Sequence, residues 1–124
     1  MAKQHVVFIS LPMSGLSEEQ IQYNLSKARS YYLCRSERPL TEVTFVDNLN
    51  CPQPPENPFP GYLPSPRMPI WYLSQALVKL SLADEVLFFP GWEKTRGCIV
   101  ERSVCTTYDI PMYDMEEKKN DQAL

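Results

Sequence analysis

The sequence predicts an α/β fold in which short buried strands alternate with amphipathic helices. Two observations carry this prediction. Several apolar runs are too short for helices and rich in β-branched and aromatic residues, and the stretches between them repeat apolar residues at helical spacing. The resulting order βαβαβαβ favours a small, doubly wound parallel sheet of about four strands, of the Rossmann or flavodoxin-like kind. Right-handed crossovers then give the expected strand order 2-1-3-4.

The strands are expected where the chain is continuously apolar or β-branched. HVVFISLP (5–12) and DEVLFFP (84–90) suit strands that are buried on both faces, as in a parallel sheet. TEVTFVDNL (41–49) and PMYDM (111–115) supply the other two strands. The chain therefore contains enough strand for one compact sheet.

Three helices are predicted between these strands, over residues 17–37, 70–83 and 96–109. Ser17 is followed by two glutamates and a glutamine, which is typical of a capped helix start. Thr95 is placed to cap the third helix. The first helix repeats apolar residues at Ile21, Leu25, Ala28 and Tyr32, and the second at Leu73, Leu77 and Leu80.

Residues 1–115 are expected to form a single domain, because 124 residues offer room for one core only. Residues 50–69 are so rich in proline that they predict a long loop. Such a loop in a compact domain is either a functional lid or interface segment or a solvated excursion. Residues 116–124 form a polar tail without an apolar face.

Composition restricts the partners. The net charge is −3 with acidic and basic residues interspersed, which argues against nucleic acid and anionic membranes as partners and favours a small ligand. No apolar run approaches the roughly 20 residues of a spanning helix, and the start lacks the features of a signal peptide, so a cytoplasmic protein is expected. Four cysteines without a CxxC pair and a single histidine do not make a usual zinc set. We therefore expect free thiols, no metal and no cofactor.

Glu101 is the most informative residue of the chain. Parallel sheets bind ligands beyond the carboxyl ends of their strands, and two turns, LPMSG and PGWEKTRG, follow the first and third strands. Glu101 lies one helical turn after Gly97, on a stripe with Cys98, Val104, Cys105 and Tyr108. A carboxylate on such a stripe costs several kcal/mol unless it is paired or opens into a cleft. The alternative is a structural ion pair with Arg96 or Arg102.

Three segments, FISLPMSG, ADEVLFFPGWEKTRGCIVE and IPMY, together resemble the nucleoside 2-deoxyribosyltransferase superfamily, especially its short uncharacterised bacterial and phage branch. The resemblance spans nearly the whole chain, and its most specific part is the run Gly-Trp-Glu-Lys-Thr-Arg-Gly-x-x-x-Glu. It implies that Glu101 is the nucleophile that attacks the anomeric carbon of a nucleoside or nucleotide. A carboxylate suits this chemistry, because it can attack or stabilise an oxocarbenium-like centre while the base leaves.

The same resemblance implies the other site residues. Gly97 would leave room for the sugar, and Gly91, Trp92 and Arg96 would line the same cleft, although plain packing is the alternative for Trp92. The resemblance also places three residues of the first turn, Met13, Ser14 and Gly15, against the ligand, and it implies a homo-oligomer.

This chain departs from the superfamily pattern at two positions. Leu11 stands where relatives have a glycine, and Ala76 stands where they have an aspartate. We expect Asp47, at the end of the second strand, to replace that carboxylate; Asp84 begins the third strand, at the end opposite the cleft. Two alternatives stay open: a binding protein of this fold with weakened chemistry and, by fold analogy alone, a flavodoxin-like mononucleotide binder.

Overall fold

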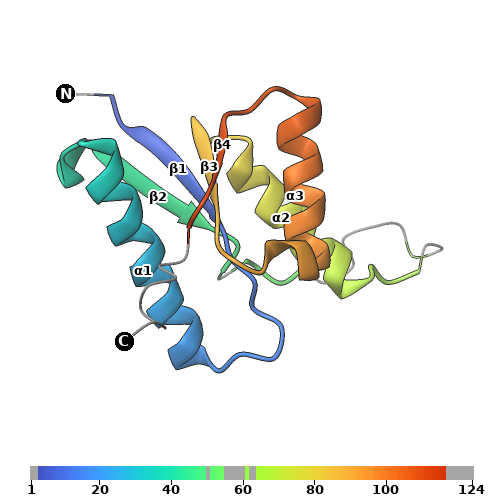
Figure 1. The fold of residues 1–124 in the computed structure, drawn as a ribbon. Helices are drawn as coiled ribbons and strands as arrows, with labels where there is room; N and C mark the ends of the chain where they lie inside the picture. The colour runs from blue at the N-terminus through green and yellow to red at the C-terminus, as the bar shows by residue number, and fades with distance from the viewer. Residues whose placement is uncertain (1–2, 50, 55–60, 62–63, 117–124) are drawn as a thin grey trace.

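A computed structural model describes residues 3–49, 51–54, 61 and 64–116 of the chain. Its four strands form one sheet in the order β2-β1-β3-β4, and every neighbouring pair is parallel (Figure 1). The strands are β1 (His5–Ser10), β2 (Val43–Asp47), β3 (Glu85–Phe88) and β4 (Met112–Asp114). The predicted α/β class and strand order are confirmed.

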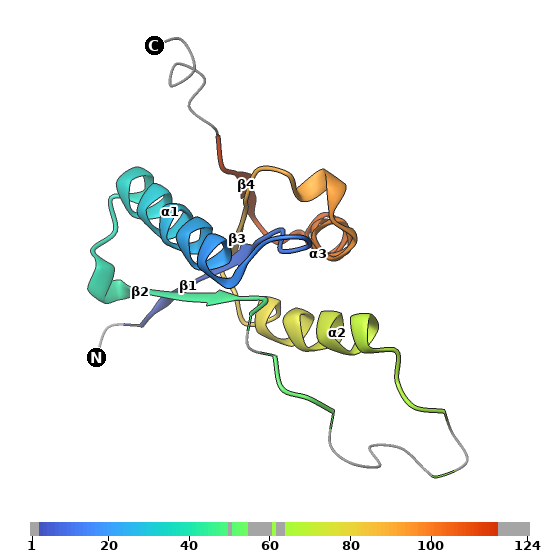
Figure 2. The same cartoon turned by 90° about the horizontal axis from the view of Figure 1, so that it is seen from below.

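Helices cover both faces of this sheet, as a doubly wound fold requires (Figure 2). The helices are α1 (Glu18–Ser36), α2 (Met68–Leu80) and α3 (Arg96–Thr107), with short 3-10 helices η1 (Leu40–Glu42) and η2 (Trp92–Lys94). α1 lies on one face, and α2 and α3 lie on the other (Figures 1 and 2). The sheet is thus the middle layer of three.

The alternation of side chains along β1 divides the core into two parts. Val7 and Ile9 pack with Leu25 of α1. Phe8, the residue between them, packs on the other face with Ala76 of α2 and Cys105 of α3. Because β1 is central and covered on both sides, its residues from Val7 to Ser10 are all completely buried.

The helix ends differ slightly from the expected ones. Ser17 caps α1 with a complete capping box, as the sequence indicates. α2 begins two residues earlier than expected, because Pro69 is well tolerated in the first turn of a helix. Thr95 occupies the N-cap of α3, but its side chain makes no capping hydrogen bond and lies 3.5 Å from the carbonyl oxygen of Gly91. Tyr108 ends this helix and is exposed rather than part of a buried stripe.

The Pro-rich segment 50–69 is described only in part. Residues 51–54 and 64–67 have no regular structure, and most of the remainder lies outside the described residues. The first part is held to α2 by two contacts: Trp71 Nε1 donates to the carbonyl oxygen of Pro52 at 2.9 Å, and Gln53 Nε2 donates to the Tyr72 hydroxyl at 2.6 Å. Of the polar tail, only Glu116 is described.

The turns after β1 and β3 lie side by side, as the strand order predicts. Gly91 has φ of 96°, a conformation that favours glycine, and a Cβ atom placed on it would lie 3.8 Å from Cγ of Pro12.

Within the described ranges, none of the helices is long and apolar enough to cross a membrane.

Candidate functional site

A pocket of about 180 Å³ lies at the carboxyl ends of the strands, where the two turns meet the start of α3. The β1 turn, the end of β2, and helices α2 and α3 all contribute to its wall. It is lined by Leu11, Met13, Ser14, Asn48, Pro69, Tyr72, Leu73, Ala76, Thr95, Gly97, Cys98 and Glu101. This is the end of a parallel sheet at which ligands are expected.

Glu101 reaches this pocket from the second turn of α3. It is only 1% exposed, so the helix carries a carboxylate into the core between α3 and the sheet. The hydroxyl of Ser10, at the end of β1, donates a hydrogen bond of 2.6 Å to Oε1 of Glu101. The other oxygen, Oε2, has no hydrogen-bond partner among the residues that the structure describes.

The surroundings of Glu101 change its acidity. Burial raises the pKa of Glu101 from its ordinary value of 4.5 to about 7, while the hydrogen bond from Ser10 opposes the rise. Two thiols of the same helix, those of Cys98 and Cys105, have pKa values raised to about 11, chiefly by burial. Glu101 is therefore a carboxyl group that changes its charge near neutral pH, with neutral thiols beside it.

The proposed alternative, a structural ion pair of Glu101, is not what the structure describes. Arg102 forms an ion pair with Asp114 and lies with its guanidinium 4.1 Å from the ring centre of Trp92. Arg96 is exposed at the first turn of α3. Among the described side chains, no cation lies within ion-pair distance of Glu101.

Three of the predicted binding residues line the pocket with Glu101: Met13, Ser14 and Gly97. Gly15 lies in the same turn, with φ of 79°, but outside the pocket wall, and Gly91 lies against Pro12. Gly97 has open space where its Cβ would be, which agrees with an opening at this position.

Trp92 and Arg96 are not brought to the pocket wall. Trp92 packs on Phe88 at 5.9 Å between ring centres and borders a separate, shallower hollow on the other side of α3. The 3-10 turn of η2, which starts at Gly91, places the indole there. The structure thus assigns Trp92 the packing position that was the alternative for this residue.

Asp47 also lies outside the pocket wall. Its carboxylate accepts a hydrogen bond from the backbone N–H of Leu49 at 2.9 Å and lies 3.9 Å from the guanidinium of Arg29 on α1. Alternation along β2 places Asp47 on the same face as Phe45, which packs in the α1 part of the core. The next residue, Asn48, lines the pocket instead and donates from Nδ2 to the carbonyl oxygen of Leu11 at 3.2 Å.

Leu11 and Ala76 are both part of the pocket wall. Leu11 is fully buried and packs in the α1 part of the core, so its side chain closes the pocket at the end of β1. Ala76 of α2 is 2% exposed and lines the same pocket as Glu101. Among the described lining residues, Glu101 is the only carboxylate.

Sequence reasoning missed Ser10, the hydrogen-bond partner of Glu101, and several residues of the wall, among them Asn48 and Tyr72. A signal for Ser10 was present, because it is a hydroxyl residue directly after the apolar run Val6–Ile9 in a strand whose two faces are both buried. Asn48 and Tyr72 gave no comparable signal. No group of three or more His, Cys, Asp and Glu side chains within the described part of the chain is arranged to hold a metal ion.

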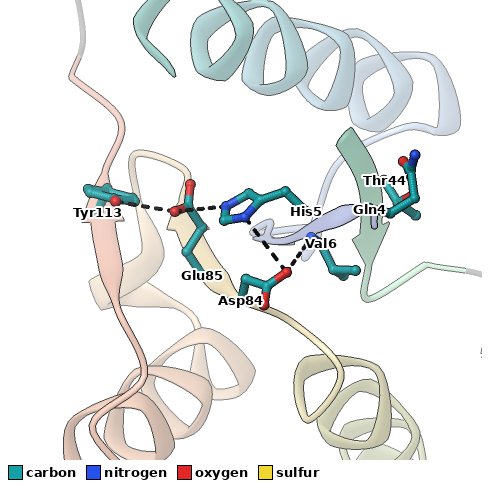
Figure 3. Close-up of polar contacts among 7 residues, drawn as sticks. All are labelled: Gln4, His5, Val6, Thr44, Asp84, Glu85 and Tyr113. Carbon is teal, nitrogen blue, oxygen red and sulfur yellow. Dashed lines mark hydrogen bonds and ion pairs between the residues drawn. The ribbon is translucent and has the colours of Figure 1, made fainter. Parts of the chain in front are cut away.

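A second polar cluster lies at the opposite, amino ends of the strands (Figure 3). Nε2 of His5 lies 3.1 Å from Oε2 of Glu85, an ion-pair contact rather than a well-aligned hydrogen bond, and the Tyr113 hydroxyl donates to the same oxygen at 3.2 Å. Asp84 accepts a 2.7 Å hydrogen bond from the backbone N–H of Val6. Asp84 is therefore far from the pocket and joins β1 to the start of β3.

Comparisons of the chain with protein-family models, with curated proteins and with solved structures found no match.

Proposed function

We propose that this chain is an enzyme of the nucleoside 2-deoxyribosyltransferase type, which cleaves or transfers at the N-glycosidic bond of a (deoxy)nucleoside or nucleotide. The observation that carries the proposal is Glu101, a buried carboxyl group without a cationic partner among the described residues, in the wall of a pocket at the carboxyl end of the sheet. The resemblance of the motifs around Glu101 supplies the substrate class.

In the proposed reaction, a carboxylate oxygen of Glu101 forms a bond to the anomeric carbon of the sugar. The C–N bond breaks, its electron pair leaves with the base, and a glycosyl ester of Glu101 remains. The departing base takes up a proton from solvent. Water or a second base then attacks the same carbon, gives up a proton to solvent and releases the carboxylate. The sugar passes through an oxocarbenium-like state in both steps, which the negative charge of Glu101 stabilises.

The acidity of Glu101 sets the pH dependence of this reaction. With a pKa of about 7, the group is protonated below neutral pH and ionised above it. A nucleophile must be ionised, so kcat/KM should rise as the pH increases through about 7. A carboxyl group that acted only as a general acid would give the opposite slope.

The size of the pocket supports a sugar beside Glu101. A volume of about 180 Å³ is below the roughly 300–1,000 Å³ of sites that enclose a whole ligand, so it suits one part of a nucleoside. Apolar side chains of Met13, Leu73 and Ala76 form much of its wall. The base would then extend toward the mouth of the pocket.

A panel of ribo- and deoxyribonucleosides and their 5′-monophosphates, with and without an acceptor base, tests the proposal by chromatography of the products. We expect release or exchange of the base by the parent chain and at least a 10³-fold loss in Glu101→Gln. Glu85→Gln is the matched control, because it makes the same chemical change at the other end of the sheet. Equal turnover of the parent and Glu101→Gln would reject the nucleophile.

A nucleoside- or nucleotide-binding protein of the same fold is the second candidate. The observation that favours it is Ala76, which leaves Glu101 as the single carboxylate among the described lining residues, so no second acid is in place to protonate the leaving base. Calorimetric binding of a nucleoside that is recovered unchanged after long incubation would select this candidate.

A cytoplasmic homo-oligomer is part of the same proposal. All four cysteines are free, which fits a reducing compartment. Ile70 and Val78, eight residues apart on α2, are 62% and 59% exposed, which fits a subunit contact on this helix. Sedimentation equilibrium would measure the assembly state.

A further inference from the structure

Ser10 is the one hydrogen-bond partner of Glu101 among the described residues, and it is held rigidly. It is the last residue of the central strand, it is completely buried, and its register with Phe88 of β3 fixes its backbone on that side. Its hydroxyl donates to Oε1 of Glu101 at 2.6 Å, a short distance typical of an O–H bond to a carboxylate. The strand therefore holds one oxygen of a carboxylate that belongs to a helix.

The two carboxylate oxygens consequently differ. Oε1 is bound to Ser10, whereas Oε2 has no partner among the described residues, and the side chain borders the pocket. The alternative is that Ser10 serves a structural purpose only, by satisfying the buried Glu101 and the neighbouring Cys98 thiol, and the experiment below separates the two roles.

We propose that Ser10 is the positioning residue of the site: its hydroxyl holds Oε1 of Glu101 and leaves Oε2 directed to the pocket as the attacking oxygen. This inference rests on the proposed function. In each half of the reaction Oε2 makes or breaks the bond to the sugar, while the Ser10 proton stays on its own oxygen and the hydrogen bond strengthens as Glu101 becomes ionised.

The hydrogen bond also affects the pH at which Glu101 ionises, although burial has the larger effect. A donor to the carboxylate favours its charged form and so opposes the effect of burial. The titratable neighbours are Cys98 and Cys105 on α3, Cys51 after β2, and Tyr72 on α2. Burial raises the pKa of all three thiols, so they stay neutral over the range in which Glu101 titrates.

The test uses Ser10→Ala, with Ser10→Thr as the variant that retains a hydroxyl and Ser103→Ala as the control. Ser103 is exposed on the outer face of α3, two residues from Glu101. The side-chain carboxyl carbon of Glu101 is followed by ¹³C NMR against pH, and its signal is assigned by its absence in Glu101→Gln. This readout does not depend on turnover.

We expect Ser10→Ala to raise the pKa of Glu101 from about 7 to about 8, because a charged hydrogen bond is lost. Turnover at pH 7 should fall at least tenfold with little change in KM, and the pH profile should move upward by the same amount as the pKa. Ser10→Thr should restore both values, and Ser103→Ala should change neither.

An unchanged pKa and an unchanged pH profile in a folded Ser10→Ala protein would overturn the inference. So would an equal loss of activity in Ser10→Ala and Ser10→Thr without a change in the pKa. A third outcome is a raised pKa of Glu101 in Ser10→Ala together with a parent chain that turns over nothing in the panel. This outcome would support the hydrogen bond by which Ser10 positions the carboxylate and would overturn only the glycosidic reaction.

Discussion

Glu85 and Glu101 are both buried, 7% and 1% exposed, and lie at opposite ends of the same sheet. Glu85, at the amino end, has a histidine and a tyrosine hydroxyl within about 3 Å of one oxygen (Figure 3). Glu101, at the carboxyl end, has one serine hydroxyl and a pocket. A buried carboxylate that has its partners in place holds parts of the fold together. A buried carboxylate that the fold leaves partly unpaired is available to a ligand.

The buried Glu85 also changes the pKa values of the two tyrosines near it. Burial, together with the nearby charge of Glu85, raises the pKa of Tyr32 to about 12, and burial with the same charge raises the pKa of Tyr113. The ring of His5 stacks on Tyr32 at 6.5 Å. The amino end is thus a connected cluster, whereas at the carboxyl end one oxygen of Glu101 has no hydrogen-bond partner among the described residues.

Substitution of Glu101 by glutamine should give the largest effect on stability, a gain relative to the parent whose size should depend on pH. The folded state binds the Glu101 proton up to a pH of about 7, whereas the unfolded chain releases it near 4.5, so the parent loses stability between these values. The loss is on the order of 3 kcal/mol. Urea unfolding measures the free energy of unfolding of both proteins at about pH 4 and pH 8. Between these two pH values, the stability of Glu101→Gln relative to the parent should increase by this amount. A constant difference between the two proteins would contradict the raised pKa.

The same substitution at Glu85 should have the opposite sign. Glu85→Gln removes the charge that faces His5 and weakens the bond from Tyr113, so we expect a loss of about 2 kcal/mol in the free energy of unfolding near pH 6. Turnover should be retained, since Glu85 is far from the pocket. If Glu85→Gln and Glu101→Gln lowered stability equally, the distinction between a structural carboxylate at Glu85 and an unpaired carboxylate at Glu101 would be wrong.

Ala76→Asp should add a second acid to the described wall of the pocket. Ala76 borders the pocket of Glu101, so in the proposed reaction a carboxyl group at this position would protonate the leaving base and should raise turnover about tenfold. Stability should fall, because Ala76 also packs in the core beside Phe8. Ala76→Asn is the matched control, with the same shape and no acid. A gain in both variants would point to shape rather than to proton transfer.

Asp47→Asn should have the smallest effect. Asp47 faces α1 and lies 3.9 Å from the partly exposed Arg29, so we expect less than a twofold change in turnover and at most about 1 kcal/mol in stability. Steady-state kinetics and urea unfolding measure the two quantities. A tenfold loss of turnover would instead identify Asp47 as the relocated acid.

The fold could be predicted because its signals are local. The apolar strands around Phe8 and Leu87 are short, continuous and separated by periodic helices, and the handedness rule then fixes the strand order. Glu101 could be singled out in the same way, as a charged residue on an apolar stripe. A hydroxyl in a buried strand also marks Ser10, but its pairing with Glu101 could not be predicted, because the two residues meet only through the packing of α3 on β1.

The directions of side chains at the ends of strands and turns could not be predicted from the sequence either. The side chains of Asp47 and Asn48 leave β2 on opposite sides, and a difference of one residue decides which of them reaches the pocket. Trp92 follows Gly91, whose left-handed backbone starts a 3-10 turn that carries the indole to the far side of α3. The spacing of residues in the sequence predicts neither of these two orientations.

The contact between Ser10 and Glu101 also affects how the molecule folds. The two residues are 91 positions apart, so their contact belongs to the slow, non-local class, and we expect α3 to dock after β1 has paired with β2. At that moment the carboxyl group must either carry a proton or lose its water as an ion. The rate of folding should therefore fall as the pH rises from about 4.5 toward about 7, the range in which the unfolded chain has released the Glu101 proton and the folded protein still binds it, which makes assembly of this pocket a protonation-dependent step.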